Sequence, residues 1–303
     1  MAVSFFFLGK GGVGKSTTSA LTALGLARRG LDVLLVSLDP AHNQRDLFGE
    51  PFSDRPRRVT AGLRVVEIDQ ERWIRRYLDG VQARIEENYR YLTSFNLERY
   101  FRVLRHSPGL EEHALLMAYR ANLDRFGEAD ALVLDMAPTA LSLRFFQLPA
   151  LSLTWARHLA ELRREIVEKR EIVTRVRLPG GEVETDTVLR RLDESIAEYE
   201  ALDTAFRDGA RTRITVVLTP ERLALSESRR IVERLGETGI GVERVLVNRV
   251  TPEAGTLVER IREAFPGPEL VTVPLADPPP IGLERLDAVL ADGRFPLPNL
   301  PSR

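Results

Sequence analysis

The sequence predicts an α/β fold, in which a doubly wound, mostly parallel sheet of about seven or eight strands carries an added helical subdomain. Three observations support this prediction. Short apolar runs of strand type recur along the chain, helical patterns lie between most of them, and a glycine-rich loop directly follows the first run. Strand, glycine loop and helix form the context of a phosphate-binding loop, or P-loop. We expect all 303 residues to form a single P-loop domain.

The predicted strands are the apolar runs 3–8, 33–38, 64–68, 131–135, 214–218, 244–247 and 270–273. Three of these strands lead directly into a polar residue, namely Asp39, Asp135 or Asn248. Ligands of doubly wound parallel sheets bind beyond the carboxyl ends of the strands. We therefore expect these three side chains at a binding site, although an aspartate after a strand can also be an ordinary turn or capping residue.

The glycine-rich loop is the most specific motif in the chain. Residues 9–16 read G-K-G-G-V-G-K-S and match the pattern G-x-x-x-x-G-K-[ST]. Such a loop points its backbone N–H groups at an anion, and the following helix adds the positive end of its dipole. We expect Lys15 to contact the β- and γ-phosphates of a nucleotide and Ser16 to ligate Mg²⁺. The predicted nucleotide-binding residues of the loop are Gly11, Gly12, Val13, Gly14, Lys15, Ser16 and Thr17.

A second lysine in the loop, Lys10, is not required by the general pattern. Lysine is rare in this chain, with three residues against forty arginines, so its use here favours a function. The segment resembles the deviant P-loop K-G-G-x-G-K-[ST] of dimeric ATPases, in which the extra lysine reaches the nucleotide of the partner subunit. The alternative is a solvated lysine on an exposed loop.

Further motifs extend this resemblance over nearly the whole chain. They are D-P-A-H-N at 39–43, D-M-A-P-T at 135–139, L-R-F-F-Q-L-P at 143–149, V-N-R at 247–249, and V-P-L with P-P-I-G-L-E-R-L between 273 and 286. Together with the P-loop and in this order, they resemble the family of ATPases that drive arsenite pumps or target tail-anchored membrane proteins. The resemblance implies a Mg²⁺-dependent ATP hydrolase.

The same resemblance implies specific roles in hydrolysis. Asp39 would orient or deprotonate the attacking water, and Asp135 would hold the Mg²⁺ shell through water or through the Ser16 hydroxyl. Lys15 and a partner's Lys10 would neutralise charge that develops on the phosphates, which is the main contribution of protein groups to phosphoryl transfer.

Two further segments are expected to sense the nucleotide. The resemblance implies that Asn248 reads the adenine edge and that Pro274 packs near the base. One amide can both donate to and accept from adenine, which agrees with this role. Pro138 and Thr139 would belong to a switch that senses the γ-phosphate. The residues after this switch, 140–142, depart from the family pattern, so its coupling to nucleotide is left open.

Two stretches read as helical insertions. Residues 69–126 show strong amphipathic periodicity, and a second segment runs from about 151 to 205. We predict that they form a helical subdomain within the single domain of residues 1–303. In the family, such helices cover the sheet and, in the targeting branch, form a groove for a hydrophobic client helix when two subunits close. Helices that simply pack on the core are the alternative.

The composition excludes several partners and chemistries. The formal net charge is −1, so no electrostatic argument supports a nucleic-acid partner. The absence of cysteine excludes disulfides, iron–sulfur ligation and a cysteine-based zinc site. No apolar stretch approaches the length of a membrane span, and the first apolar run leads directly into the P-loop. We therefore expect a cytoplasmic protein without direct membrane insertion.

Three functions remain open at this point. The first is an ATP-driven switch that binds or delivers hydrophobic, tail-anchored-type protein segments, as a homodimer or with a related subunit. The second is the energising subunit of an anion or metalloid efflux system, although trivalent arsenic prefers thiolate ligands that a cysteine-free chain lacks. The third, a partition or positioning ATPase, needs a basic DNA-binding surface or a membrane-binding amphipathic tail. The proline-rich C-terminal segment F-P-L-P-N-L-P does not supply such a helix.

Overall fold

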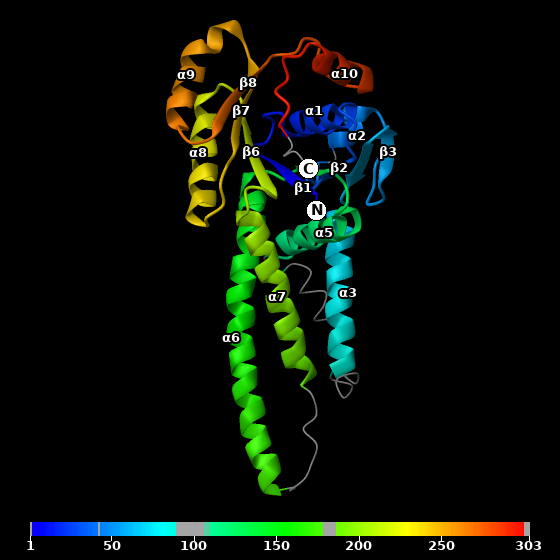
Figure 1. Cartoon of the computed structure of the whole chain (residues 1–303), viewed down its shortest axis with the longest axis vertical. Helices are drawn as coiled ribbons and strands as arrows, with labels where there is room; N and C mark the ends of the chain where they lie inside the picture. The colour runs from blue at the N-terminus through cyan, green and yellow to red at the C-terminus, as the bar shows by residue number, and fades with distance from the viewer. Residues whose placement is uncertain (1, 42, 89–106, 108, 178–185, 300–303) are drawn as a thin grey trace. The chain divides into compact units, whose positions relative to one another are not determined.

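The computed structural model describes residues 2–41, 43–88, 107, 109–177 and 186–299. Their strands form one eight-stranded sheet in the order β3-β4-β2-β5-β1-β6-β7-β8 (Figure 1). The strands are β1 (Val3–Leu8), β2 (Val33–Ser37), β3 (Arg57–Thr60), β4 (Leu63–Glu67), β5 (Ala131–Asp135), β6 (Thr212–Leu218), β7 (Arg244–Val250) and β8 (Glu269–Pro274). Neighbouring strands pair in parallel, except that β3 and β4 are antiparallel.

Helices connect the strands, as the sequence predicts. They are α1 (Lys15–Arg28), α2 (Asn43–Phe48), α3 (Gln70–Asn88), α5 (Leu110–Phe126), α6 (Thr139–Arg177), α7 (Thr187–Arg207), α8 (Arg222–Glu237), the 3₁₀ turn η2 (Pro252–Ala254), α9 (Gly255–Ala264) and α10 (Leu283–Ala291). The helix α1 ends at a basic last turn and at Gly30, which has a φ of 87°. A left-handed glycine is the usual stop for a helix.

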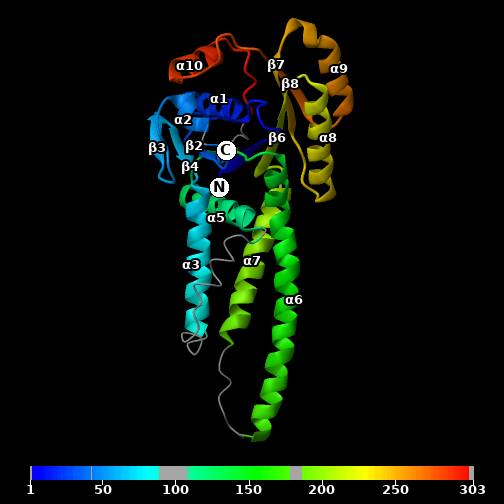
Figure 2. The ribbon, with the colours of Figure 1, turned by 180° about the vertical axis from the view of Figure 1, so that it is seen from behind.

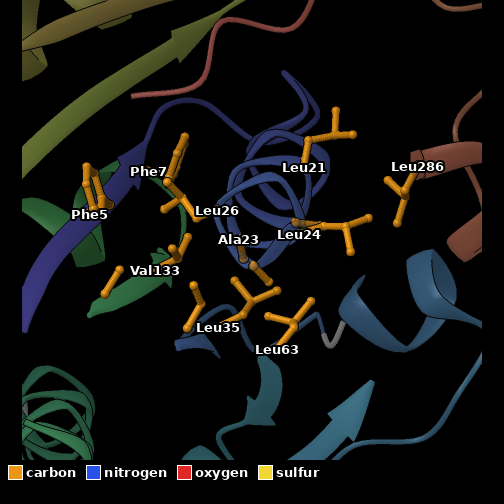
Figure 3. Packing of buried hydrophobic residues seen from close by; sticks show 14 of the residues in the cluster. Phe5, Phe7, Leu21, Ala23, Leu24, Leu26, Leu35, Leu63, Val133 and Leu286 are labelled. Carbon is orange, nitrogen blue, oxygen red and sulfur yellow. The ribbon is translucent and has the colours of Figure 1, made fainter. Parts of the chain in front are cut away.

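The side chains of β1 alternate between the two faces of the sheet. Phe5 and Phe7 belong to a buried cluster with α1 and with Leu286 of α10, and Figure 3 shows this packing. Phe6, on the other face, packs against Tyr119 of α5, with ring centroids 5.4 Å apart. Figure 2 shows α1 and α10 side by side from behind, as Figure 1 does from the front.

The same alternation continues to the far edge of the sheet. Leu246 of β7 joins the α1 cluster, whereas its neighbours Val245 and Val247 join a second cluster with α8 and α9. Because adjacent residues of a strand point to opposite faces, helices cover both faces of the sheet. The predicted α/β fold, with a doubly wound and mostly parallel sheet, is confirmed.

One strand was not predicted. β3 has the sequence R-R-V-T, pairs only with β4, and is exposed or half-buried along its length. Its register with β4 also shifts between Arg58 and Thr60. An edge strand of this kind needs no apolar face, so its sequence lacks the periodicity by which the other strands were found.

The chain divides into two compact units, Met1–Phe145 with Gly209–Arg303, and Phe146–Asp208. The sheet, α3 and α5 belong to the first unit, and α7 with most of α6 forms the second. In the second unit, Arg157 pairs with Glu200 at 2.6 Å, and Arg163 pairs with Asp186 at 2.8 Å. These pairs show that the two helices run antiparallel.

Within the predicted insertions, residues 70–88, 110–126, 151–177 and 187–205 are helical. Residues 89–106 and 178–185 lie outside the described residues, and α6 begins at Thr139 instead of near residue 151. A functional helical subdomain built from both insertions stays a prediction. None of the helices in the described ranges is both long enough and apolar enough to cross a membrane.

Candidate functional site

The P-loop connects the carboxyl end of β1 to α1, at the centre of the sheet between β5 and β6. Two of its glycines cannot carry a side chain. Gly9 has a φ of 150°, and a Cβ there would lie 2.2 Å from the carbonyl oxygen of Val217. Gly14 has a φ of 96°, and a Cβ there would lie 2.2 Å from Nδ2 of Asn248. The loop therefore approaches both neighbouring segments with bare backbone.

The first turn of α1 contains no acidic residue and no capping side chain. Its N-cap is Gly14, which offers no side-chain hydrogen bond. The first N–H groups of a helix and the positive end of its dipole attract an anion. Lys15 is buried beside them, and its Nζ donates to the carbonyl oxygen of Lys10 at 3.3 Å. The arrangement suits a phosphate group.

The two lysines of the loop differ in their surroundings. Lys15 is buried, whereas Lys10 is half-buried on the outer turn of the loop. Within the ranges that the structure describes, no ion pair involves the Lys10 ammonium. Part of the Lys10 residue is exposed, whereas Lys15 is enclosed.

The two predicted carboxylates lie at the ends of adjacent strands. Ser37, the last residue of β2, pairs in register with Asp135, the last residue of β5. Asp39 follows β2 and is nearly buried, and its Oδ1 accepts a hydrogen bond from the amide of Ala41 at 3.0 Å. The structure thus brings Asp39 and Asp135 together beside the P-loop.

Asp135 is completely buried, which dominates its electrostatics. Burial raises the pKa of its carboxyl to about 6. Hydrogen bonds from Ser16 and Gln44 and the charge of Lys15 act in the opposite direction, while the charge of Asp39 raises the pKa further. The carboxylate is therefore charged at neutral pH but only partly compensated.

The surroundings of Asp135 fit a hydrated Mg²⁺ ion. Among the residues that the structure describes, three buried polar atoms near it have no hydrogen-bond partner, namely Oδ1 of Asp135, Oε1 of Gln44 and Oγ of Ser37. Mg²⁺ usually takes one or two protein oxygen ligands and keeps several waters, which can donate to such atoms. Among the described residues, no group of three His, Cys, Asp or Glu could hold a metal.

The predicted switch with Pro138 and Thr139 starts directly after β5. Thr139 begins α6, and the preceding Pro138 is exposed. Ser142, one of the residues that depart from the family pattern, is buried, and its Oγ donates to the carbonyl oxygen of Ala137 at 2.5 Å. This bond fixes the turn between β5 and α6.

A cavity of about 440 Å³ lies beside the first turn of α1. Its lining includes Thr17, Leu21, Asn248, Pro274 and Phe295. The mostly apolar wall and the size suit a small aromatic ligand. Asn248 and Pro274, predicted from separate motifs, thus lie in one cavity.

Asn248 also has a role that the sequence did not predict. Its Nδ2 donates to the carbonyl oxygen of Val13 at 2.9 Å, so the end of β7 holds the P-loop in place. The next residue, Arg249, has a φ of 57°, which is uncommon for a residue other than glycine. Such a conformation at a cavity wall is typical of functional sites.

Comparison with known proteins agrees with this geometry. A family model described as anion-transporting ATPase matches residues 2–291. The chain belongs to the anion-transporting ATPase family. It is 33% identical over 250 residues to a protein named arsenical pump-driving ATPase 2 of Aquifex aeolicus, covering 82% of this chain and 80% of that protein. It is 28% identical over 302 residues to a protein named ATPase get3 of Aspergillus terreus, covering 93% and 87%.

A third relative is named ATPase ASNA1 homolog, from Cryptosporidium parvum. It is 29% identical over 247 residues, which cover 81% of this chain and 64% of that protein. Family membership confirms the predicted resemblance. The protein is an ATP-binding ATP hydrolase of the anion-transporting ATPase family.

One residue of the candidate site was not predicted from the sequence. Gln44 is fully buried and contacts the carboxylate of Asp135. A signal was present, because Gln44 shares one face of α2 with the buried residues Leu47 and Phe48. A polar residue at an apolar position of a helix needs a buried hydrogen-bond partner.

Alanine at Gly14 is expected to disrupt the loop even without nucleotide. The clash with Asn248 and the left-handed φ of 96° should lower the free energy of unfolding by about 2–4 kcal/mol. Gly11 is the matched control, because its Cβ would meet no atom within 4 Å. Gly11→Ala should stay within about 1 kcal/mol of the wild type. Urea unfolding measures both variants, and equal losses would contradict the proposed contact.

Asparagine at position 135 is expected to stabilise the chain when metal and nucleotide are absent. Because the pKa of Asp135 is raised from 3.8 to about 6, the folded state holds the proton more tightly than the unfolded state does. Ionisation at pH 7.5 therefore destabilises the fold. Asp135→Asn should raise the free energy of unfolding by about 1–3 kcal/mol at that pH.

The pH dependence of this effect provides its control. As pH falls through about 6, the folded carboxylate takes up its proton, so the advantage of Asp135→Asn should shrink by about half at pH 5. Urea unfolding in EDTA at both pH values measures the difference. A constant advantage, or none at pH 7.5, would contradict the assignment of the shift to burial of the charge.

Proposed function

We propose that this ATPase is a nucleotide-driven switch that depends on Mg²⁺ and works as a dimer. In this proposal, the switch binds or delivers hydrophobic protein segments of the tail-anchored type. The observation that carries the proposal is an exposed apolar stripe on α6. Five large side chains at helical spacing form this α6 stripe: Leu151, Trp155, Leu159, Leu162 and Ile166.

The α6 stripe is unusual for a surface that meets only water. Trp155 is 65% exposed, and the other four side chains are between 46% and 57% exposed. From Leu151 to Ile166 the stripe extends for about 22 Å along the helix axis. A contiguous apolar surface of this kind marks a site of interaction. Its length approaches the roughly 30 Å of a membrane-spanning helix, which supports a client helix as the ligand.

We infer that the P-loop and Lys15 bind the triphosphate, and that Ser16 and Asp135 hold Mg²⁺. The metal would shield phosphate charge, while Asp39 orients or deprotonates the attacking water. The uncapped N-terminus of α1 and the orphaned acceptors around Asp135 support these roles. The remaining contacts of the phosphates come from the backbone of the loop, including Gly11, Gly12 and Val13.

The base is expected in the cavity beside Thr17. We propose that Asn248 recognises the adenine edge and that Pro274 packs near the ring. The contact with Val13 uses one N–H of the Asn248 amide. The second N–H and the oxygen remain able to form hydrogen bonds with the base.

Lys10 is proposed to act on the nucleotide of a second subunit, in a homodimer or with a related chain. Its half-buried place on the outer turn of the loop and its lack of an ion pair in the described structure support this role. A cytoplasmic location stays a prediction.

A second candidate function is the energising subunit of an anion or metalloid efflux system. One observation favours it, since two relatives from Aquifex aeolicus are named arsenical pump-driving ATPases. The absence of cysteine weighs against a thiolate site for trivalent arsenic. Stimulation of ATP hydrolysis by arsenite would favour this function over client binding. The net charge of −1 gives no support to the partition-type alternative.

Lys10→Ala and Asp39→Asn are each expected to lower ATP turnover at least about 100-fold while the fold survives. Lys169→Ala is the matched control, because Lys169 is an exposed lysine on α6. It should turn over at the wild-type rate. Steady-state ATPase assays of the purified variants measure this, and full activity in Lys10→Ala or Asp39→Asn would exclude the proposed roles.

Mixing the two inactive variants tests whether Lys10 acts across subunits. In a mixed pair, the chain with Lys10→Ala keeps its own Asp39 and receives Lys10 from its partner. Half of randomly formed pairs are mixed, and one of the two sites in each mixed pair is complete. Activity should therefore return to about one quarter of the wild-type rate. No recovery after confirmed subunit exchange would place Lys10 in its own site.

Polar replacement of the α6 stripe should abolish client binding and leave ATP binding intact. Leu159→Ser with Leu162→Ser removes two exposed leucines, so the affinity for a synthetic 20-residue apolar helical peptide should fall at least about tenfold. Leu223→Ser is the control, because Leu223 of α8 is also an exposed leucine. Fluorescence anisotropy of the labelled peptide measures the affinities. Equal affinity of the stripe variant and the control would refute the α6 stripe as the client surface.

A further inference from the structure

We propose that Gln44 is a positioning residue of the metal site: its side-chain amide fixes the Asp135 carboxylate and joins it to the segment that carries Asp39. The inference rests on the proposed Mg²⁺ site. It concerns a residue outside the D-P-A-H-N motif, in the first turn of α2.

Gln44 is placed by the packing of α2. Leu47 and Phe48 anchor the same face of this helix in the core next to α1. The backbone N–H of Arg45 donates to Oε1 of Glu67 at 3.0 Å, which also ties α2 to the end of β4. Held from two sides, the helix directs a fully buried amide toward the end of β5.

The hydrogen bonds of the amide define what it does. Nε2 of Gln44 donates to Oδ2 of Asp135 at 2.9 Å, and it lies 3.3 Å from the carbonyl oxygen of Ser16 and 3.4 Å from Oγ of Ser19. An amide nitrogen has two hydrogens, so the shortest contact takes one and the two α1 oxygens compete for the other. One side chain thereby connects β5, α1 and α2.

This connection links two groups that nucleotide hydrolysis needs together. The Asp135 carboxylate belongs to the proposed Mg²⁺ site, and Gln44 follows the segment that begins with Asp39, the residue proposed to act on the attacking water. If α2 shifts, the amide loses its contact with Asp135. If the carboxylate turns, α2 loses its only charge-assisted bond to β5 in the described chain. A donor to a metal-binding carboxylate fixes its orientation and its affinity for the metal.

The oxygen of the same amide supports a role beyond neutralising the carboxylate. Oε1 of Gln44 is buried and has no hydrogen-bond partner in the part of the chain that the structure describes, and the same holds for Oδ1 of Asp135 and Oγ of Ser37. A buried unpaired oxygen destabilises the free protein, and an apolar side chain of equal size would avoid this. In the proposed site, Oε1 would accept a hydrogen bond from water bound to the metal. Nε2 donates to the Asp135 carboxylate, so the two ends of the amide would contact the two parts of the site.

Gln44→Met tests the proposal, because methionine keeps the length of the side chain and removes both polar groups. We measure the affinity for a non-hydrolysable ATP analogue twice, by calorimetry in Mn²⁺ and in EDTA. The gain in affinity from Mn²⁺ should fall 10–100-fold in Gln44→Met. The affinity in EDTA should stay within about twofold of the wild type, since the P-loop is untouched. Loss of affinity in EDTA to the same extent would show a merely structural role and overturn the proposal.

Two further variants sharpen the result. Ser19→Ala removes only the 3.4 Å contact and should keep the full gain from Mn²⁺. In an Asp135→Asn background, Gln44→Met should have little additional effect, because Gln44 acts through that carboxylate. Additive losses would overturn the proposal. If the wild type itself gains nothing from Mn²⁺, the proposed metal site fails; if the wild type gains and Gln44→Met gains equally, only the role of Gln44 fails.

A measurement on the wild-type chain covers the case in which Gln44→Met does not fold. The chain has four glutamines, and Gln44 alone among them is fully buried. In protein labelled with ¹⁵N-glutamine, we therefore expect its side-chain amide to exchange most slowly. This signal should shift when Mg²⁺ is added to the complex with ADP, and much less when ADP is added in EDTA. Equal shifts in both steps would overturn the proposal.

Discussion

The complete burial of the Asp135 carboxylate is the constraint on which the site depends. β5 lies between β1 and β2, so the strand order itself removes this charge from water. A buried charge destabilises a fold unless neighbouring groups compensate it. The hydroxyl of Ser16, the amide of Gln44 and the ammonium of Lys15 do so only in part, because the pKa remains at about 6. The free protein therefore keeps an unsatisfied negative charge at the centre of its sheet.

The P-loop carries the opposite charge. The N-terminus of α1 has neither a capping side chain nor an acidic residue in its first turn. A chain that folds with both groups incompletely paired is less stable than it could be. A ligand that pairs them stabilises the folded state by its binding free energy. Magnesium and a triphosphate together carry the two charges that such a site lacks, which is why we propose them jointly and not one alone.

A feature could be predicted from the sequence where a short segment specifies it, and could not where it depends on residues that only the fold brings together. The P-loop, Asp39 and Asp135 could be predicted as site residues because short segments next to apolar strands specify them, and their roles stay predictions. Asn248 was predicted to contact a base, but its bond to Val13 depends on β7 and the P-loop meeting in space. β3 was missed because an exposed edge strand has no apolar pattern. Gln44 was missed because its partner lies 91 positions away in the sequence, and only the fold brings the two together.

Unpaired charges at the nucleotide site imply a charged ligand, and the exposed apolar surface of the α6 stripe likewise implies an apolar partner. Ala156 and Ala160, one residue along from Trp155 and Leu159, are buried, so α6 already has a packed side. Along a helix, adjacent residues point about 100° apart, and the large side chains therefore occupy a separate face. A helix that packs only within its own chain would have polar residues on its exposed face, such as the arginines and glutamates found elsewhere on α6. Exposed tryptophan, leucine and isoleucine in one line favour a partner that is itself apolar and extended. An anion or metalloid would gain nothing from such a surface, and this favours a hydrophobic protein segment as the cargo of the switch.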